Sequence, residues 1–168
     1  MKKYVLLAIC LCIAVCSVPN VNAQSSTTSS DPSKFYINFG AISDDDFTSF
    51  YWQTGVMLDL PLGNNLFITP EAMFLGYKFN FDELYLYPGA TINLKFGEKG
   101  NSFFVGGGLL LYILLAPSGH DFDFFSDLIL KIHGGFIGDN LKLTAYMYTF
   151  TQGLFDSVLF GANVGFAL

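Results

Sequence analysis

Apolar residues recur at every second position over unusually long stretches of this chain. Between residues 83 and 96, one set of alternate positions consists of Leu84, Leu86, Pro88, Ala90, Ile92, Leu94 and Phe96. The intervening set consists of Tyr85, Tyr87, Gly89, Thr91, Asn93 and Lys95. A period of two over 10–14 residues predicts β-strands that are longer than the 5–6 residues usual in soluble sheets. Such strands are long enough to cross a bilayer at a tilt, which takes about 9–11 residues.

Eight segments follow this rhythm, and each is bounded by Gly, Asn, Asp or Pro. We predict strands at 34–42, 48–60, 66–79, 83–96, 102–116, 127–138, 141–152 and 157–168. Short breaks ("PLGNN", "GEKGN", "GDN") alternate with breaks that are longer or richer in acidic and aromatic residues ("SDDDF", "NFDE", "APSGHDFDFFSD", "GLFDS"). Short turns at one end and longer loops at the other are typical of outer-membrane barrels. The pattern therefore predicts an all-β fold, an eight-stranded antiparallel up-and-down transmembrane β-barrel.

The stretch 102–116, "SFFVGGGLLLYILLA", is apolar enough to suggest a membrane helix. As a helix, residues 103–116 would extend only about 21 Å, too short for a hydrocarbon core of roughly 30 Å. As a strand the segment spans that core even when strongly tilted. Phe103, Val105 and Leu109 would then face lipid. Gly106 and Gly108 would face inward and make room for large side chains opposite them.

The N-terminus has the three parts of a secretory signal peptide. A basic "MKK" precedes the apolar "YVLLAICLCIAVCSV", and "VNA" before Gln24 fits the cleavage rule, which predicts a signal peptide at 1–23. Residues 24–33 form a flexible polar lead-in, and 34–168 form the barrel. All three cysteines lie within residues 10–16, so the mature chain would contain none. Lipidation at Cys16 is the less favoured alternative, because Val15 suits the preceding position poorly.

The charge balance excludes one large class of partners. Removal of the signal peptide would leave six lysines against 14 acidic residues, and the chain contains no arginine. Nucleic-acid binding requires a basic surface to meet phosphate. We therefore expect no nucleic-acid partner.

Seven polar residues fall on the predicted inner face. They are Gln53, Asp59, Glu71, Lys95, Lys131, His133 and Lys142. The interior of an eight-stranded barrel is only wide enough for side chains to fill it. We therefore predict a structural network of ion pairs, with a proton or solute path as the less favoured alternative. No second His or Cys accompanies His133, so we expect no metal site, no cofactor and no catalytic residue.

The chain resembles the small outer-membrane β-barrel domain family, in the porin-like form frequent in Bacteroidetes-type Gram-negative bacteria. The resemblance rests on the signal peptide ending "VNA-Q", the eight alternating strands and the terminal "GANVGFAL", which is similar to a barrel-assembly signal. The terminal segment departs from the commonest form of that signal by ending in Leu168 and not in an aromatic residue. The family resemblance implies an outer-membrane location, a periplasmic N-terminus, contact with membrane lipid, and the barrel-assembly machinery as a partner during insertion.

Acidic residues cluster in the predicted outer loops. The candidate interaction residues are Asp44, Asp45, Asp46, Asp121, Asp123 and Asp127. A solvated surface is the favoured interpretation, and binding of divalent cations is the alternative. Ser118 and His120 suggest an alternative, because some eight-stranded barrels are lipid A-modifying enzymes that use Ser and His. They match no motif of those enzymes, and we expect no enzymatic activity.

Three functional interpretations follow from these observations. The favoured one is an integral outer-membrane barrel with a structural or surface-interaction role through its acidic and aromatic loops, its lumen largely filled. A narrow outer-membrane channel for small solutes is the alternative within the same fold. A secreted lipocalin-like barrel that binds an apolar ligand is the alternative from another class, and it would require polar residues outside and apolar residues inside.

Overall fold

The computed structural model describes residues 32–77, 80–98, 100–115, 128–152 and 154–168. The predicted signal peptide and most of the polar lead-in lie outside these residues. The described part of the chain is all-β. Its strands are β1 (Lys34–Asp44), β2 (Phe50–Pro61), β3 (Leu66–Tyr77), β4 (Asn80–Glu98), β5 (Asn101–Leu111), β6 (Ile113–Leu114), β7 (Leu128–Ile137), β8 (Leu141–Phe150) and β9 (Val158–Ala167).

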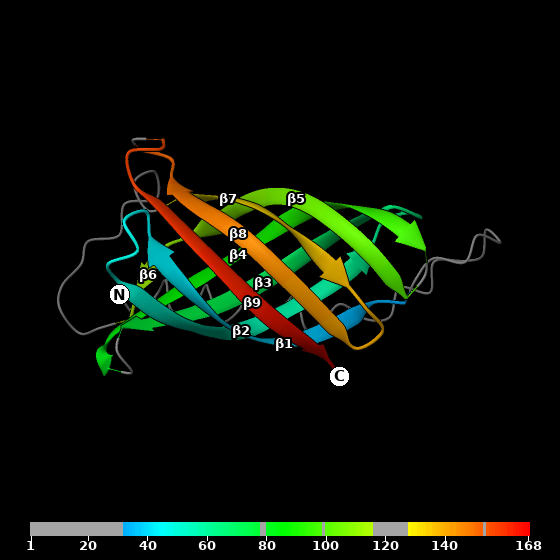
Figure 1. Ribbon diagram of the computed structural model, residues 1–168, viewed down its shortest axis with the longest axis horizontal. Helices are drawn as coiled ribbons and strands as arrows, with labels where there is room; N and C mark the ends of the chain where they lie inside the picture. Colours follow the sequence, from blue (N-terminus) through cyan, green and yellow to red (C-terminus); the bar gives the residue numbers. More distant parts are fainter. Residues whose placement is uncertain (1–31, 78–79, 99, 116–127, 153) are drawn as a thin grey trace, which may run out of the picture.

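The strands close into a single barrel, which Figure 1 shows as ribbons running obliquely around a common axis. Every pairing is antiparallel, and the order around the sheet is β3-β2-β1-β9-β8-β7-β5-β4, with β4 returning to β3. The short β6 also pairs with β4, so β5 and β6 form one stave interrupted at Tyr112. The fold is a closed eight-stranded up-and-down barrel, as predicted.

The observed boundaries lie within a few residues of those predicted, with one difference of substance. Residues 80–82 were predicted to belong to a loop, and that prediction is wrong. The β3–β4 ladder continues to the pair Tyr77–Asn80, after a register shift between Gly76 and Tyr77. Polar composition marked this segment as a loop, but pairing with the neighbouring strand extends β4 through it.

The connections differ between the two ends of the barrel. One end, here called the turn end, carries the short connections β2–β3, β4–β5 and β7–β8. The other, the loop end, carries the longer connections β1–β2, β6–β7 and β8–β9. It also carries the β3–β4 connection, which was predicted among the longer or more acidic breaks but is as short as β4–β5 because β3 and β4 extend toward each other. β1 begins and β9 finishes at the turn end, where Leu168 donates its backbone N–H to the carbonyl of Phe35.

The outer face of the barrel is apolar on every stave. Twelve large hydrophobic residues, each at least 37% exposed, form what we call the apolar belt: Phe39, Val56, Phe74, Ile92, Leu94, Phe103, Val105, Leu109, Ile132, Leu143, Phe160 and Phe166. They alternate with buried residues along each strand, as the period of two requires. Monomeric soluble proteins rarely expose continuous apolar patches larger than a few hundred Å². The described residues contain no helix with the length and apolar character needed to cross a membrane.

Candidate functional site in the barrel interior

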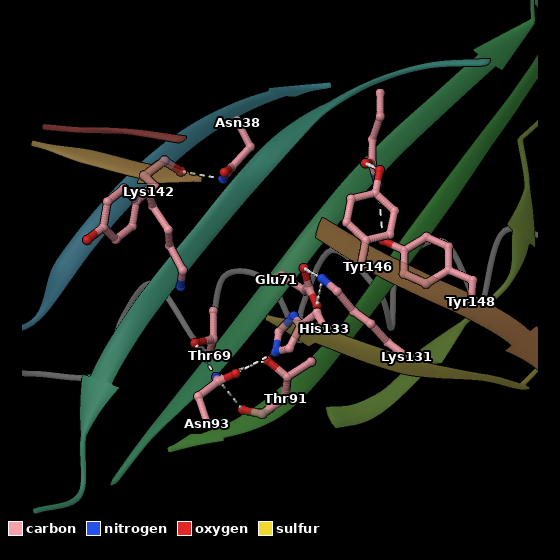
Figure 2. Close-up of polar contacts among 12 residues, drawn as sticks. Asn38, Thr69, Glu71, Thr91, Asn93, Lys131, His133, Lys142, Tyr146 and Tyr148 are labelled. Atoms are coloured by element: carbon pink, nitrogen blue, oxygen red, sulfur yellow. Dashed lines mark hydrogen bonds and ion pairs between the residues drawn. The ribbon is translucent and has the colours of Figure 1, made fainter. Parts of the chain in front are cut away.

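Two buried ion pairs cross the barrel interior. The first joins Lys131 on β7 to Glu71 on β3, and Figure 2 shows the two side chains meeting in the middle of the lumen. The Lys131 Nζ lies 2.7 Å and 2.6 Å from the two carboxylate oxygens, and both side chains are fully buried. The rings of Tyr146 and Tyr148 lie 5.4 Å and 5.7 Å from the same ammonium. The charge of Lys131 is therefore neutralised and further stabilised by two aromatic faces.

The second ion pair lies closer to the turn end. The Lys142 Nζ on β8 lies 2.7 Å and 2.8 Å from the two carboxylate oxygens of Asp59 on β2. Three rings surround this ammonium at 4.9–5.4 Å, those of Tyr36, Phe67 and Phe104. Lys142 therefore lies in an aromatic cage with one carboxylate.

A chain of hydrogen bonds runs inward from Asp59. The Thr69 hydroxyl donates to Asp59 over 2.6 Å, and the Asn93 amide donates to the Thr69 oxygen over 2.9 Å. The Asn93 amide oxygen then contacts Nε2 of His133, and both residues are drawn in Figure 2. Asn93 also donates to the hydroxyl of Thr91 over 3.2 Å. This chain connects β2, β3, β4 and β7 within the lumen.

Toward the loop end the interior becomes aromatic and aliphatic. Gln53 donates to the Tyr148 hydroxyl over 3.2 Å and accepts a hydrogen bond from the Tyr146 hydroxyl. Beyond these residues, ring centroids of Tyr87 lie 5.7 Å from Tyr148 and 5.6 Å from Tyr112. Aliphatic side chains complete this packed region, which includes the buried Ile42, Leu75, Leu110 and Ile129. The loop-end half of the lumen is therefore filled by apolar groups.

A pocket of about 230 Å³ opens at the turn end. We call it the turn-end pocket. Its lining includes Tyr36 and Asp59, which reach the interior network, and Lys34 and Lys95. Lys34 donates to the backbone carbonyl of Asp139 over 2.8 Å. Lys95 is half-buried, whereas the other six residues predicted on the inner face are buried.

The buried charged side chains of the interior bind one another. Each buried lysine is paired with one carboxylate. The described residues contain no group of three His, Cys, Asp or Glu side chains placed to hold a metal ion. His133 is bonded to Asn93 and lies edge-to-face against Phe104 at 5.5 Å, an environment of packing and hydrogen bonding.

The predicted loop residues are only partly described. Asp44 accepts hydrogen bonds from the backbone N–H of Thr48 at 2.8 Å, the Thr48 hydroxyl at 2.8 Å and the backbone N–H of Ser49 at 3.2 Å. Its carboxylate therefore stabilises the β1–β2 connection. Asp45 and Asp46 are exposed in that connection. The other predicted loop residues, Asp121, Asp123, Asp127, Ser118 and His120, lie outside the described residues.

Solved structures with a similar fold come from outer-membrane and designed barrels. The outer-membrane enzyme PagL superposes with a TM-score of 0.57 at 11% identity, covering 79% of this chain and 99% of that chain. Neisserial surface protein A (NspA) gives 0.52 at 12% identity, covering 81% and 96%. A de novo designed transmembrane β-barrel gives 0.51 at 10% identity, covering 84% and 100%. At these identities the likeness shows the fold alone. Neither a protein-family model nor a curated protein matches the sequence.

Several residues of the interior network were not among the predicted site residues. Thr69, Asn93, Tyr146 and Tyr148 each bond to a predicted residue. All four occupy the inward phase of their strands, so the period of two places them inside. Their partners could not be read from that period, because it says which face a residue occupies and nothing about its opposite neighbour.

Proposed function

We propose that this chain is an integral outer-membrane protein of a Gram-negative envelope, with a structural or surface-interaction role and no catalytic role. One observation carries the proposal: an apolar belt present on every stave surrounds an interior whose buried charges are paired and whose loop-end half is packed with side chains. The similar folds of the outer-membrane enzyme PagL and of Neisserial surface protein A support the location.

The apolar belt favours lipid as the surrounding solvent. A bilayer removes exposed apolar surface from water at about 25 cal/mol per Å². A secreted lipocalin-like protein would need the reverse arrangement, with polar residues outside and an apolar cavity inside. Here the charged residues Glu71 and Lys131 lie inside, while large apolar residues such as Phe103 and Ile132 lie outside.

The packing of the loop-end half of the lumen supports a barrel that does not conduct solutes. The apolar packing around Tyr87 and Leu110 closes the loop-end half, and both ion pairs cross the lumen below it. A narrow channel would require these groups to separate. The loops then remain as the surface through which the protein meets its partners. The barrel-assembly machinery would act during insertion.

The absence of a catalytic role is part of the proposal. PagL is described as an enzyme, and its likeness to this chain extends to the fold. In the described part of the chain, His133 has no serine, threonine or cysteine hydrogen-bond partner. Membership of the porin-like, Bacteroidetes-type family remains part of the same proposal, and so does a turn end that faces the periplasm.

Cell fractionation followed by electrophoresis of boiled and unboiled samples tests the location. We expect a band in the outer-membrane fraction whose mobility changes on heating, because folded barrels resist detergent. A protein in the soluble fraction without this change would exclude the proposal. Purified protein in planar bilayers should show no conductance steps above the lipid background. Stable conductance would favour the narrow channel.

Single cysteines test the orientation, because the mature chain is predicted to contain none. Asp45→Cys lies in the loop-end β1–β2 connection, and Asn64→Cys lies in the turn-end β2–β3 connection. In intact cells a membrane-impermeant maleimide should label Asp45→Cys and leave Asn64→Cys unlabelled until the cells are broken. The opposite pattern would reverse the proposed orientation.

A further inference from the structure

Three buried polar residues on neighbouring strands carry atoms without hydrogen-bond partners among the described residues. They are Asn38 on β1, Thr144 on β8 and Asn163 on β9, none more than 3% exposed. The atoms concerned are Oδ1 of Asn38, Oγ1 of Thr144, and both Oδ1 and Nδ2 of Asn163. A buried polar group left without a partner destabilises a fold by about 1–3 kcal/mol. Four such atoms close together therefore call for a physical explanation.

The strand register brings the three side chains to one patch of the inner wall. Thr144 lies directly opposite Asn163 on the β8–β9 ladder. Across the β1–β9 ladder, Asn163 faces Gly40 and Asn38 faces Gly165. Both asparagines lie close to these glycines. A Cβ added to Gly165 would lie 2.5 Å from Oδ1 of Asn38, and one added to Gly40 would lie 2.7 Å from Cβ of Asn163.

The hydrogen-bond donors and acceptors of the patch favour water as its ligand. The patch offers acceptors from Asn38 and Asn163, a donor from Asn163, and a Thr144 hydroxyl that can do either. A cation is disfavoured, because Lys142 lies opposite Gly165 on the β8–β9 ladder and its ammonium lies 5.4 Å from the ring of Tyr36, whose backbone carbonyl accepts the Asn38 hydrogen bond. An anion is disfavoured, because the unpaired lone pairs of the two amide oxygens would repel it. Water both donates and accepts, and buried water typically makes about three hydrogen bonds to such groups.

Two residues next to the patch connect it to the turn-end pocket. The side-chain amide of Asn38 donates to the backbone carbonyl of Tyr36 over 3.5 Å, and Tyr36 lines that pocket. Lys142, which neighbours the patch through Gly165, binds Asp59 of the same pocket. Figure 2 shows Asn38 and Lys142 on the same side of the lumen. Water that enters the pocket from the turn end would thus reach the patch past the Tyr36 backbone and the Lys142–Asp59 ion pair.

We propose that Asn38, Thr144 and Asn163 bind a small cluster of ordered water molecules, which extends the turn-end pocket into a hydrated half-lumen. The cluster satisfies the side chains that the protein leaves unpaired. The apolar packing toward the loop end limits the extent of the water cluster. The lumen is therefore hydrated toward the turn end and dry toward the loop end.

A conservative substitution distinguishes a hydrated patch from a dry one. Thr144→Val keeps the shape and removes the hydroxyl. If water binds there, the folding equilibrium constant should fall about three- to tenfold, the effect of losing one hydrogen bond. If the hydroxyl is unpaired and dry, its removal should leave the constant unchanged or raise it, and the proposal fails. Urea unfolding of the full mature chain in detergent micelles, followed by the fluorescence of Trp52, measures the constant.

Thr69→Val is the matched control, because the Thr69 hydroxyl is bonded to Asp59 and Asn93 within the protein. It should lower the constant whether or not the patch is hydrated, which shows that the assay detects a lost hydroxyl.

A direct measurement on the unaltered protein covers the case in which the variants do not fold. In micelles, the side-chain amide protons of Asn163 should show magnetisation transfer with water in nuclear magnetic resonance spectra. The amide protons of Asn93, which donate to threonine oxygens, provide the reference. Transfer at Asn163 no stronger than at Asn93 would overturn the proposal.

Discussion

The ammonium of Lys131 on β7 lies 2.6 Å from a carboxylate oxygen of Glu71 on β3, and neither side chain reaches solvent. These strands are not neighbours in the sheet, so the pair joins separate walls of the barrel. Removing charges from water is costly, and the mutual attraction of the pair repays that cost only while both partners remain. Loss of one charge should therefore destabilise the fold strongly, whereas loss of both charges should destabilise it much less.

We expect Lys131→Met to lower the free energy of unfolding by about 3–5 kcal/mol, because Glu71 would remain buried without a counter-charge. The double variant Glu71→Met with Lys131→Met should recover most of that loss, since no charge is left inside. Urea unfolding in detergent micelles checks both values. A double variant as unstable as Lys131→Met would contradict this account and point to packing.

The two ion pairs should differ in their tolerance of neutralised acids. Asp59→Asn leaves Lys142 inside three aromatic rings at 4.9–5.4 Å, whereas Glu71→Gln leaves Lys131 beside two rings at 5.4 and 5.7 Å. Cation–π contacts contribute up to about 2 kcal/mol each when desolvated. Asp59→Asn should therefore destabilise the barrel less than Glu71→Gln. Equal losses in paired unfolding curves would show that the aromatic cage contributes nothing.

The three consecutive glycines of β5 should respond very differently to alanine. A Cβ at Gly106 would clash with Oδ1 of Asn93 and lie 2.5 Å from the backbone oxygen of Ile92. A Cβ at Gly107, on the outer face, would meet one backbone oxygen at 3.2 Å. We expect Gly106→Ala to reduce the heat-modifiable folded fraction strongly and Gly107→Ala to preserve it. Comparable folding of the two variants would place both glycines in the same environment.

A charge on the apolar belt should report the depth of the surrounding bilayer. Ile132→Arg, in the middle of β7, is expected to lower the free energy of unfolding in lipid vesicles by about 2–4 kcal/mol. Leu66→Arg, at the first residue of β3, should cost no more than about 1 kcal/mol, because the cost falls near the membrane surface. Equal effects at the two positions would argue against a membrane around the belt.

Much of this architecture could be predicted from the sequence, because a period of two is a local signal. It assigned Phe103, Val105 and Leu109 to the outer face, where they are 67%, 51% and 49% exposed. Tertiary pairing overrode the local signal at 80–82, where Asn80 and Asp82 continue the strand. At Tyr112 the alternation predicted an unbroken strand, whereas β5 ends at Leu111 and β6 begins at Ile113.

The interior contacts could not be predicted in the same way. Lys131 and Glu71 are 60 residues apart, and Lys142 and Asp59 are 83 apart. Which inward residues meet depends on the stagger of strands around the closed barrel, which is a property of all eight staves together. The alternation therefore identified the charged members of the two ion pairs, and the fold was needed to pair them and to add their hydrogen-bond partners.

The seam between β1 and β9 has a consequence for the time course of folding. Its ladder begins at Tyr36–Ala167, which joins residues separated by nearly the whole described chain. Contacts between residues so far apart in sequence form slowly, because the entropy of closing the intervening loop opposes them. Until the seam closes, both strands present unpaired edges that invite association with other chains. The interval before closure is thus the period in which this protein is most vulnerable to aggregation.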